Sequence, residues 1–298
     1  MAKKHRFSTR AFEVKPGSKV NLSKLSTRAG KELLPKELAE EALAADVASL
    51  QDAQDRLHAS NRYGVLVILQ GMDASGKDGV IRHVMSGVNP LGCRAYAFKA
   101  PNEGELKHHF LWRAMPCLPE RGMISLFNRS YYEEVLVVRV HPEFLEPQRL
   151  PMLKSLKPKS LGKLWKQRYR EMNTFERTLV LNGTLVLKFF LHVSRDEQKQ
   201  RLLERMQQPE KNWKFNPRDL EERQLWKEYR GAFEDMLGET STEWAPWHVI
   251  PADNKWYARA AIADIIAARL EGLNLAYPKV TSEQRELYAK LSKALEAE

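Results

Sequence analysis

One stretch decides the fold of this 298-residue chain: Val65-Leu66-Val67-Ile68-Leu69-Gln70-Gly71-Met72-Asp73-Ala74-Ser75-Gly76-Lys77. Its first five residues form a short apolar run without polar alternation, which is typical of a strand buried on both faces of a parallel sheet. The residues from Gly71 to Lys77 fit G-x-x-x-x-G-K, a phosphate-binding loop when it connects a strand to a helix. A helical pattern follows over residues 77–88. We therefore predict a strand, a phosphate-binding loop and a helix in that order.

The alternation of strands and helices continues outward from this stretch. Further apolar runs predict strands over residues 94–98, 123–127, 185–193 and 247–251. Helical patterns lie between and around them, over residues 35–60, 103–114, 131–140, 161–181, 196–206, 219–237, 255–273 and 282–297. A capping box from Ser194 to Glu197 predicts a helix start after the strongest strand. Strands alternating with helices predict an α/β fold with a mainly parallel five-stranded sheet.

The loop offers three sources of positive potential to a phosphate. Its glycines let backbone N–H groups approach phosphate oxygens closely, the N-terminus of the following helix adds a partial charge, and Lys77 adds a full one. We therefore predict a phosphate-binding group made of Gly71, Ala74, Ser75, Gly76, Lys77 and Asp78.

One position of the loop departs from the usual motif. Asp78 follows Lys77, where a Ser or Thr hydroxyl normally holds Mg²⁺. Asp73, inside the loop, offers a hard carboxylate oxygen instead. Asp73 also suits a turn, where Asp is common. We favour a role for Asp73 in binding a metal ion or the phosphate acceptor.

A second group of polar residues follows the strand predicted over residues 123–127. Parallel sheets bind ligands at the carboxyl ends of their strands. Asn128 offers a neutral oxygen there, and Arg129 can clamp a phosphate with a bidentate fork. Glu133 can reach into the same site, or equally serve as a carboxylate in the first turn of a helix.

The chain resembles the polyphosphate kinase 2 family. The two signatures are Gly71-Met72-Asp73-Ala74-Ser75-Gly76-Lys77-Asp78 and Phe127-Asn128-Arg129-Ser130-Tyr131-Tyr132-Glu133. The region from Arg201 through Arg205 and Pro209 to Lys211-Asn212-Trp213-Lys214-Phe215 resembles the lid of that family. Ala245-Pro246-Trp247, followed by Asp253-Asn254-Lys255, resembles its closing strand and helix start. The resemblance covers about residues 35–275.

This resemblance implies a three-layer α/β/α P-loop kinase fold like that of thymidylate kinase, with one domain over residues 35–298 and a helical lid over about 195–230. It implies transfer of phosphoryl groups between inorganic polyphosphate and a nucleotide (AMP, ADP or ATP) with Mg²⁺, or Mn²⁺ in its place. The catalytic residues would be Asp73, Lys77, Arg129, Arg201 and Arg205.

The second signature departs from the common family pattern Asp-Arg-Ser-Trp-Tyr-Asn. Asn128 replaces the acidic residue, and Glu133 ends the motif. This variant resembles the subgroup that phosphorylates both AMP and ADP. We expect Asn128, Arg129 and Glu133 to bind the nucleotide, and Asp73, Asn128 and Glu133 to hold the metal ion, with Glu133 supplying the carboxylate that Asn128 lacks.

Positive charge is the main compositional signal. The net charge is +10, and residues 149–170 contain eight Lys or Arg and no Asp or Glu. Such a run is a solvated face or a groove for a polyanion. We predict a polyphosphate groove made of Lys154, Lys157, Lys159, Lys163 and Lys166.

The lid cations have two interpretations each. Arg201 and Arg205 share a helix face and would stabilise a transferring phosphoryl group, or they pair with Glu197 and Glu204. Lys214 lies between Trp213 and Phe215, and is either a phosphate ligand or a cation–π partner.

Composition limits the remaining function classes. The N-terminus lacks an apolar segment typical of a secretory signal, no run suits a membrane helix, and the chain has only two cysteines, Cys93 and Cys117. We expect a cytoplasmic homo-oligomer, a dimer or tetramer, with a loosely structured basic arm over residues 1–34.

The alternative functions are an ATP-dependent nucleoside monophosphate kinase and a basic nucleic-acid-binding protein. No nucleic-acid-binding signature is present, so we expect no nucleic-acid partner.

Overall fold

The computed structural model describes residues 7, 9–29 and 36–298. Its centre is one parallel sheet in the order β2-β3-β1-β4-β5. The strands are β1 (Gly64–Gln70), β2 (Cys93–Ala97), β3 (Ile124–Asn128), β4 (Thr184–His192) and β5 (Trp247–Pro251). Each predicted strand is confirmed to within one residue at either end, and the predicted five-stranded α/β fold is confirmed.

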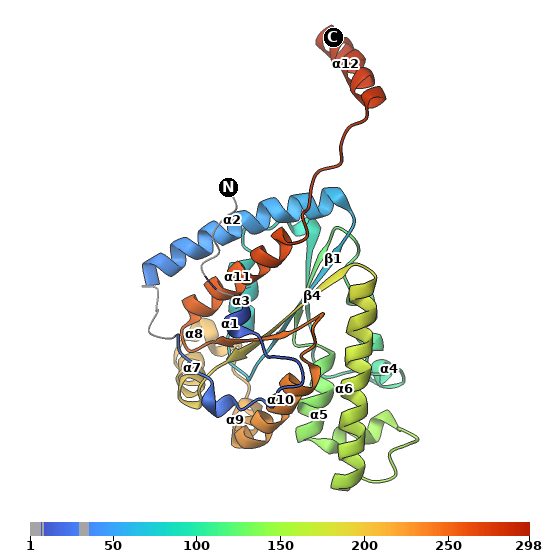
Figure 1. Cartoon of the computed structure of the whole chain (residues 1–298). Coiled ribbons are helices and arrows are strands. Elements are labelled where there is room, and N and C mark those ends of the chain that lie inside the picture. Colours follow the sequence, from blue (N-terminus) through green and yellow to red (C-terminus); the bar gives the residue numbers. More distant parts are fainter. Residues whose placement is uncertain (1–6, 8, 30–35) are drawn as a thin grey trace.

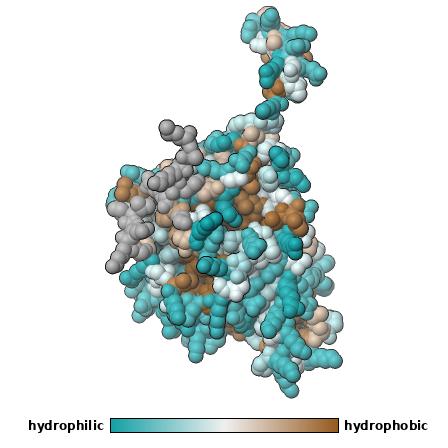
Figure 2. Space-filling model, viewed as in Figure 1, coloured by the Kyte–Doolittle hydropathy of each residue, from teal (hydrophilic) through white to brown (hydrophobic). Residues whose placement is uncertain are grey.

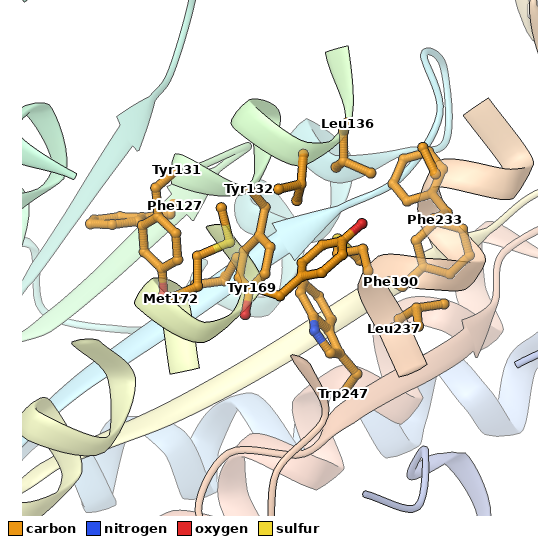
Figure 3. Close-up of a cluster of buried hydrophobic side chains, with 14 of the residues drawn as sticks. Phe127, Tyr131, Tyr132, Leu136, Tyr169, Met172, Phe190, Phe233, Leu237 and Trp247 are labelled. Atoms are coloured by element: carbon orange, nitrogen blue, oxygen red, sulfur yellow. The ribbon is translucent and has the colours of Figure 1, made fainter. Parts of the chain in front are cut away.

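Helices cover both faces of the sheet (Figure 1), which explains why β1 shows no polar alternation. On one face, Val65, Val67 and Leu69 pack against α2 (Lys36–Ser60), α3 (Lys77–Val84) and α11 (Lys255–Glu271). On the other face, Leu66 and Ile68 join the core under α6 (Pro158–Leu181) and α10 (Trp226–Thr240). Figure 3 shows the aromatic part of this second core, including Phe127, Phe190, Phe233 and Trp247.

The remaining helices are short or form the lid region. They are α1 (Thr9–Phe12), α4 (Glu103–Leu106), α5 (Val137–Val140), α7 (Arg195–Gln207), α8 (Pro209–Asn212), α9 (Arg218–Gln224) and α12 (Ser282–Glu296). Short 3-10 helices span Leu22–Lys24, Pro90–Gly92, Trp112–Cys117, Tyr131–Val135 and Pro142–Gln148. No helix in the described ranges is both long and apolar enough to cross a membrane.

Three predicted helices are wrong as continuous elements. The helix expected over 103–114 ends at Leu106, and the helix expected over 131–140 starts as a 3-10 turn before α5. The helix expected over 219–237 is interrupted at Leu225, which separates α9 from α10. These segments form the walls of the site. Their side chains point toward the site instead of recurring on one face of a helix. Tertiary packing sets this arrangement, and the periodicity of the sequence does not detect it.

The described part of the basic arm is packed, contrary to the loose structure expected for it. Val14 N donates to Trp247 O at 2.8 Å, and Ser241 Oγ donates to Val14 O. Leu22 is buried, and its N–H donates to Glu234 of α10. The arm thereby covers the outer edge of β5, where unpaired backbone groups would otherwise be exposed. Residues 1–6, 8 and 30–34 of the predicted arm lie outside the described residues.

The helix α12 stands apart from the domain (Figures 1 and 2). Thr281 and Gln284 form a capping box at its start. Apolar side chains lie exposed along it, at Leu287, Tyr288, Leu291 and Leu295. The predicted terminal helix is therefore confirmed, but it adds nothing to the core of the domain.

Candidate active site

Two glycines shape the loop between β1 and α3. Gly71 has a φ of +155°, and a Cβ there would lie 2.8 Å from Ser75 Oγ and 2.9 Å from Leu191 O. Gly76 has a φ of +108° at the N-terminus of α3. A side chain at either position would be strained, so the loop conformation requires glycine. The predicted strand–loop–helix unit is confirmed.

Lys77 folds back onto its own loop. Its Nζ donates to Gly71 O at 2.8 Å and to Met72 O at 3.2 Å, with Ser75 Oγ at 3.4 Å. Burial lowers the pKa of Lys77 to about 8, and the Arg129 cation acts in the same direction. A bound phosphate would supply the negative charge that this buried ammonium lacks.

Arg201 of α7 binds backbone carbonyls of the phosphate-binding loop. Its Nη1 donates to Ala74 O at 3.0 Å and Ser75 O at 2.8 Å, and its Nη2 to Ala252 O and Asp253 O. Its Nε contacts Glu197. All five N–H donors are thus used on protein acceptors. The prediction that Arg201 lies over a transferring phosphoryl group is not supported. In the structure, Arg201 binds and fixes the backbone of the loop.

Arg129 joins the loop to the end of β3. Its Nη2 lies 2.6 Å from Asp73 Oδ1, and its Nη1 lies 3.5 Å from Glu133 Oε2. Arg129 has a φ of +62°, which is strained for a residue with a side chain, and its N–H donates to Leu69 O. The structure therefore brings together Asp73, Arg129 and Glu133, as predicted from two distant motifs.

Glu133 lies beside this cation, with Lys77 and Asp73 also near its carboxylate. Burial raises the pKa of Glu133, although the Arg129 and Lys77 charges oppose that effect. Its neighbour on the chain, Glu134, points elsewhere and pairs with Arg168 of α6. The position of Glu133 supports the site interpretation over a helix-dipole role, because its carboxylate faces the loop.

Asp78 does not face the loop interior. Its Oδ1 accepts a hydrogen bond from Asn128 Nδ2 at 2.6 Å, and its side chain is exposed at the start of α3. The predicted phosphate-binding role of Asp78 is therefore not supported, since this carboxylate is used to hold α3 to the end of β3. The bond leaves the Asn128 carbonyl oxygen available.

A cavity of about 200 Å³ opens between the loop and the predicted lid. Gly71, Asp73, Arg129 and Glu133 line one side. Residues of α9 and α10 line the other: Arg218, Asp219, Glu222, Arg223, Trp226, Tyr229 and Phe233. Arg205 reaches this wall by pairing with Asp219 at 3.2 Å, rather than with Glu204. We call this space the loop cavity.

A second cavity of about 310 Å³ adjoins the loop cavity. The two share Arg129, Glu133 and Val137. The second is mainly apolar and aromatic, with Phe98, Phe110, Tyr131, Phe144 and His108 in its wall. We call it the aromatic cavity. Its apolar interior ends at the Arg129 cation, beside the phosphate-binding loop.

Several predicted residues lie elsewhere. Lys214 is exposed, and its Nζ lies 5.0 Å from the centre of the Trp213 ring, which is the cation–π alternative. The five lysines predicted to form a groove are exposed and line neither cavity: Lys154, Lys157, Lys159, Lys163 and Lys166. Their role in guiding polyphosphate stays a prediction. No cluster of three or more His, Cys, Asp or Glu suited to a metal ion occurs in the described ranges.

Sequence reasoning missed the residues that brace the site. Gln198 Nε2 donates to Asp73 O at 3.0 Å, and Gln70 Nε2 donates to Ser130 Oγ. A buried network lies beneath the second motif (its Tyr131 and Tyr132 appear in Figure 3), where the hydroxyls of both tyrosines donate to Glu176 at 2.7 Å. Lys188 of β4 pairs with the same carboxylate at 2.6 Å. The sequence held one signal of this network, because Lys188 is a charged residue inside an otherwise apolar strand.

Comparison with known proteins identifies the family and the fold of the chain. The sequence model of the family described as "Polyphosphate kinase 2" matches residues 34–277. A solved structure described as polyphosphate kinase 2 from Arthrobacter aurescens has a TM-score of 0.84 and 36% sequence identity, and covers 97% of this chain and 99% of that one. The predicted P-loop kinase-like fold and the family resemblance are confirmed.

Two curated relatives extend over most of the chain. A protein of Rhodopseudomonas palustris named ADP-polyphosphate phosphotransferase is 49% identical over 282 residues, which are 94% of this chain and 96% of that protein. A protein of Meiothermus ruber named AMP/ADP-polyphosphate phosphotransferase is 48% identical over 244 residues, or 82% and 85% of the two chains. Because the family model matches residues 34–277 and both relatives align over most of their own length, the chain belongs to the polyphosphate kinase 2 family.

Proposed function

We propose that this protein transfers phosphoryl groups from inorganic polyphosphate to AMP and ADP, giving ADP and ATP, and that the reaction is reversible. The observation that carries the proposal is the junction of two unlike cavities at Arg129 and Glu133. One contains a phosphate-binding loop, and the other is apolar and aromatic. Family membership and the names of the relatives support polyphosphate as the donor.

The aromatic cavity suits the nucleoside of the acceptor. Its rings can stack on a base, and Arg129 at its inner end can bind the acceptor phosphate with a bidentate fork. The loop cavity suits the end of a polyphosphate chain, because Gly71 and Asp73 of the loop and Arg129 line it, and Lys77 lies beneath the loop with its Nζ on Gly71 O. The two phosphates would then meet between Lys77 and Arg129.

The reaction needs positioning and charge neutralisation more than covalent chemistry by the protein. An oxygen of the acceptor phosphate forms a bond to the terminal phosphorus of polyphosphate, and the bond from that phosphorus to its bridging oxygen breaks. The electron pair stays on the shortened chain. Arg129 and Lys77 stabilise the oxygens of the transferring group, while Asp73 and Glu133 hold the Arg129 guanidinium in place.

The donor set fits a Mg²⁺ ion, with Mn²⁺ as a substitute. Asp73, Glu133 and the free oxygen of Asn128 are hard ligands near the loop. Mg²⁺ is usually held by one or two carboxylates together with substrate phosphates, so a full protein cage is not required. When bound, the ion would neutralise phosphate oxygens.

A direct assay tests the proposal. The protein is incubated with Mg²⁺, long-chain polyphosphate and either AMP or ADP, without ATP, and nucleotides are separated by chromatography. We expect ADP and ATP from AMP, and ATP from ADP. If no nucleotide is phosphorylated there but AMP is phosphorylated with ATP as donor, the protein is an ATP-dependent nucleoside monophosphate kinase instead.

A homo-oligomer, either a dimer or a tetramer, is part of the proposal. The exposed stripe of α12 at Leu287, Leu291 and Leu295 suits a second copy of the same helix. Antiparallel pairing would bring Glu283 and Glu286 of the first half near Lys290 and Lys293 of the second half. Light scattering during gel filtration tests this contact: Leu291→Glu should lower the measured mass, whereas Lys279→Glu, outside the helix, should not.

A further inference from the structure

A third cavity lies beside the loop cavity, on the other side of Trp226. This open groove has a volume of about 380 Å³. Its walls come from residues 22–28 of the arm, from residues 192–195 at the start of α7, and from Trp226 and Arg230 of α10. Trp226 also lines the loop cavity. Figure 1 shows the blue arm passing beside α7, α9 and α10. We call this space the arm groove.

The boundary between the two cavities is itself cationic. Arg223 lines the loop cavity, and its Nη1 donates to Arg195 O at 2.8 Å and to Gln198 Oε1 at 2.7 Å. Its guanidinium lies 5.9 Å from the centre of the Trp226 ring. A ligand extending from the loop past Trp226 would therefore pass one arginine before it entered the arm groove.

The arm groove is lined by cations and lacks a lining carboxylate among the described residues. Three arginines contribute: Arg28, Arg195 and Arg230. Arg28 Nε lies 3.6 Å from Asp253 Oδ2, while the Arg28 side chain stays 77% exposed and that of Asp253 is only 5% exposed. The Asp253 oxygens also accept from Ser194 N and Thr27 Oγ1. Glu234 is 4.0 Å from Arg230, a loose contact. The charge facing solvent in this groove is positive.

The arm contributes Arg28 to the cationic lining of this groove. Residues 1–34 of the sequence contain nine Lys or Arg and two Glu. Because the arm is fixed along β5 and α10, its residues 22–28 form a wall of the groove rather than a free tail. The lining also holds the hydroxyl-bearing residues Ser23, Ser26 and Thr27. Leu22, Leu25, Val193 and Trp226 also line the groove. The arginines and hydroxyls of this open groove suit a phosphate backbone.

We propose that the arm groove binds the distal phosphates of a long polyphosphate chain whose reacting end lies in the loop cavity. This inference rests on the proposed function, because it assumes that polyphosphate is the donor. A chain of a few phosphates fills the loop cavity alone, whereas a long chain passes Trp226 and contacts Arg28, Arg195 and Arg230. The groove then sets the preference for chain length without touching the reacting atoms.

The test compares two chain lengths in one triple variant. In Arg28→Gln/Arg195→Gln/Arg230→Gln, we expect kcat/KM for polyphosphate of about 100 phosphates to fall on the order of tenfold, because three exposed charge contacts are lost. With tripolyphosphate as donor, kcat/KM should change by less than about twofold, since those contacts are made only by the distal chain. The salt dependence of KM for the long chain should also become shallower.

A matched variant removes three charges from a different basic surface. Lys157→Gln/Lys163→Gln/Lys166→Gln alters exposed residues of the segment predicted from sequence to form the groove. If that variant loses long-chain activity while the arginine variant keeps it, the arm groove is not the binding surface. Equal losses for both chain lengths in the arginine variant would likewise overturn the inference, because the loop site would then be affected.

Two further controls keep the outcomes distinct. Arg195→Gln alone alters an exposed side chain at the start of α7, so it supplies the comparison if the triple variant fails to fold; it should show the same selective loss to a smaller degree. If the unaltered protein phosphorylates no nucleotide with either chain length, the proposed function fails. If it uses both and the arginine variants keep the same ratio of long-chain to short-chain kcat/KM, only the arm groove fails.

Discussion

The Arg129 guanidinium lies 2.6 Å from the Asp73 carboxylate, and this contact joins the two motifs of the site. Asp73 follows β1 and Arg129 follows β3, two neighbouring parallel strands whose carboxyl ends meet at one edge of the sheet. Arg129 also contacts Glu133, so one cation lies between two carboxylates. Without that cation the two carboxylates would repel phosphate.

Asp73→Asn is the first variant to make. The amide keeps the size of the side chain but removes the charge that holds Arg129 and that suits a metal ion. We expect kcat to fall on the order of a hundredfold, as for loss of one preorganised electrostatic contact. Thermal unfolding should shift little, because Asp73 is partly exposed. Asp52→Asn on the surface of α2 is the matched control, and an Asp73→Asn protein of normal kcat would exclude a catalytic role.

Lys77 predicts how activity depends on pH. Burial lowers its pKa to about 8, so the free protein loses this charge above pH 8. Polyphosphate favours the charged form, and its KM should rise by up to about tenfold per pH unit above pH 8. This rise in KM is not caused by unfolding. The pKa of Lys77 is lower in the folded state than in the unfolded state, so the free energy of unfolding increases as pH rises from about 8 to about 10.5. Lys77→Arg stays charged, so a pH profile as steep as that of the unaltered protein would assign the effect to another group.

Phe144 tests the assignment of the aromatic cavity. It is 48% exposed, lines that cavity, and stacks on His141 with ring centres 5.4 Å apart. Phe144→Ala should raise the KM for AMP and ADP several-fold, about 1–2 kcal/mol of lost stacking, while the KM for polyphosphate stays constant. Met152→Ala, another exposed apolar residue outside the cavity, should change neither value. A rise in the polyphosphate KM alone would place the nucleoside elsewhere.

The buried pair of Glu176 and Lys188 predicts a non-additive effect on stability. Both side chains are fully buried at 2.6 Å, and Lys188 Nζ also donates to Thr240 O. Lys188→Met leaves the Glu176 charge buried without its partner, and should lower the free energy of unfolding by about 3–5 kcal/mol in urea denaturation.

The double variant Glu176→Gln/Lys188→Met removes both charges and should lose less stability than Lys188→Met alone. Additive losses would mean that the two residues do not act as a pair. Because both tyrosines of the second motif donate to Glu176, we also expect kcat to fall in the single variant.

The sheet and the phosphate-binding loop were predictable because local rules govern them. An apolar run without alternation, followed by G-x-x-x-x-G-K, has few other interpretations, and Gly71 and Gly76 occupy conformations that only glycine adopts freely. The meeting of Asp73, Arg129 and Glu133 also followed, since parallel strands place their carboxyl ends together. The phosphate-binding interpretation is not supported for Arg201 and Asp78. The alternative pairing of Arg201 with Glu197 is confirmed, whereas the other partners of Arg201 and the partner of Asp78 lie far away in the sequence.

The sequence by itself determined five strands, a phosphate-binding loop and a surplus of positive charge. Only the tertiary structure decided where that charge acts, because the position of a charge depends on which surfaces pack together. Packing along β5 brings Arg28 of the arm to the arm groove, which shares Trp226 with the loop cavity, and leaves Lys163 exposed on α6 outside both. Charge runs are local in sequence, whereas an anion-binding groove is made by contacts between distant segments.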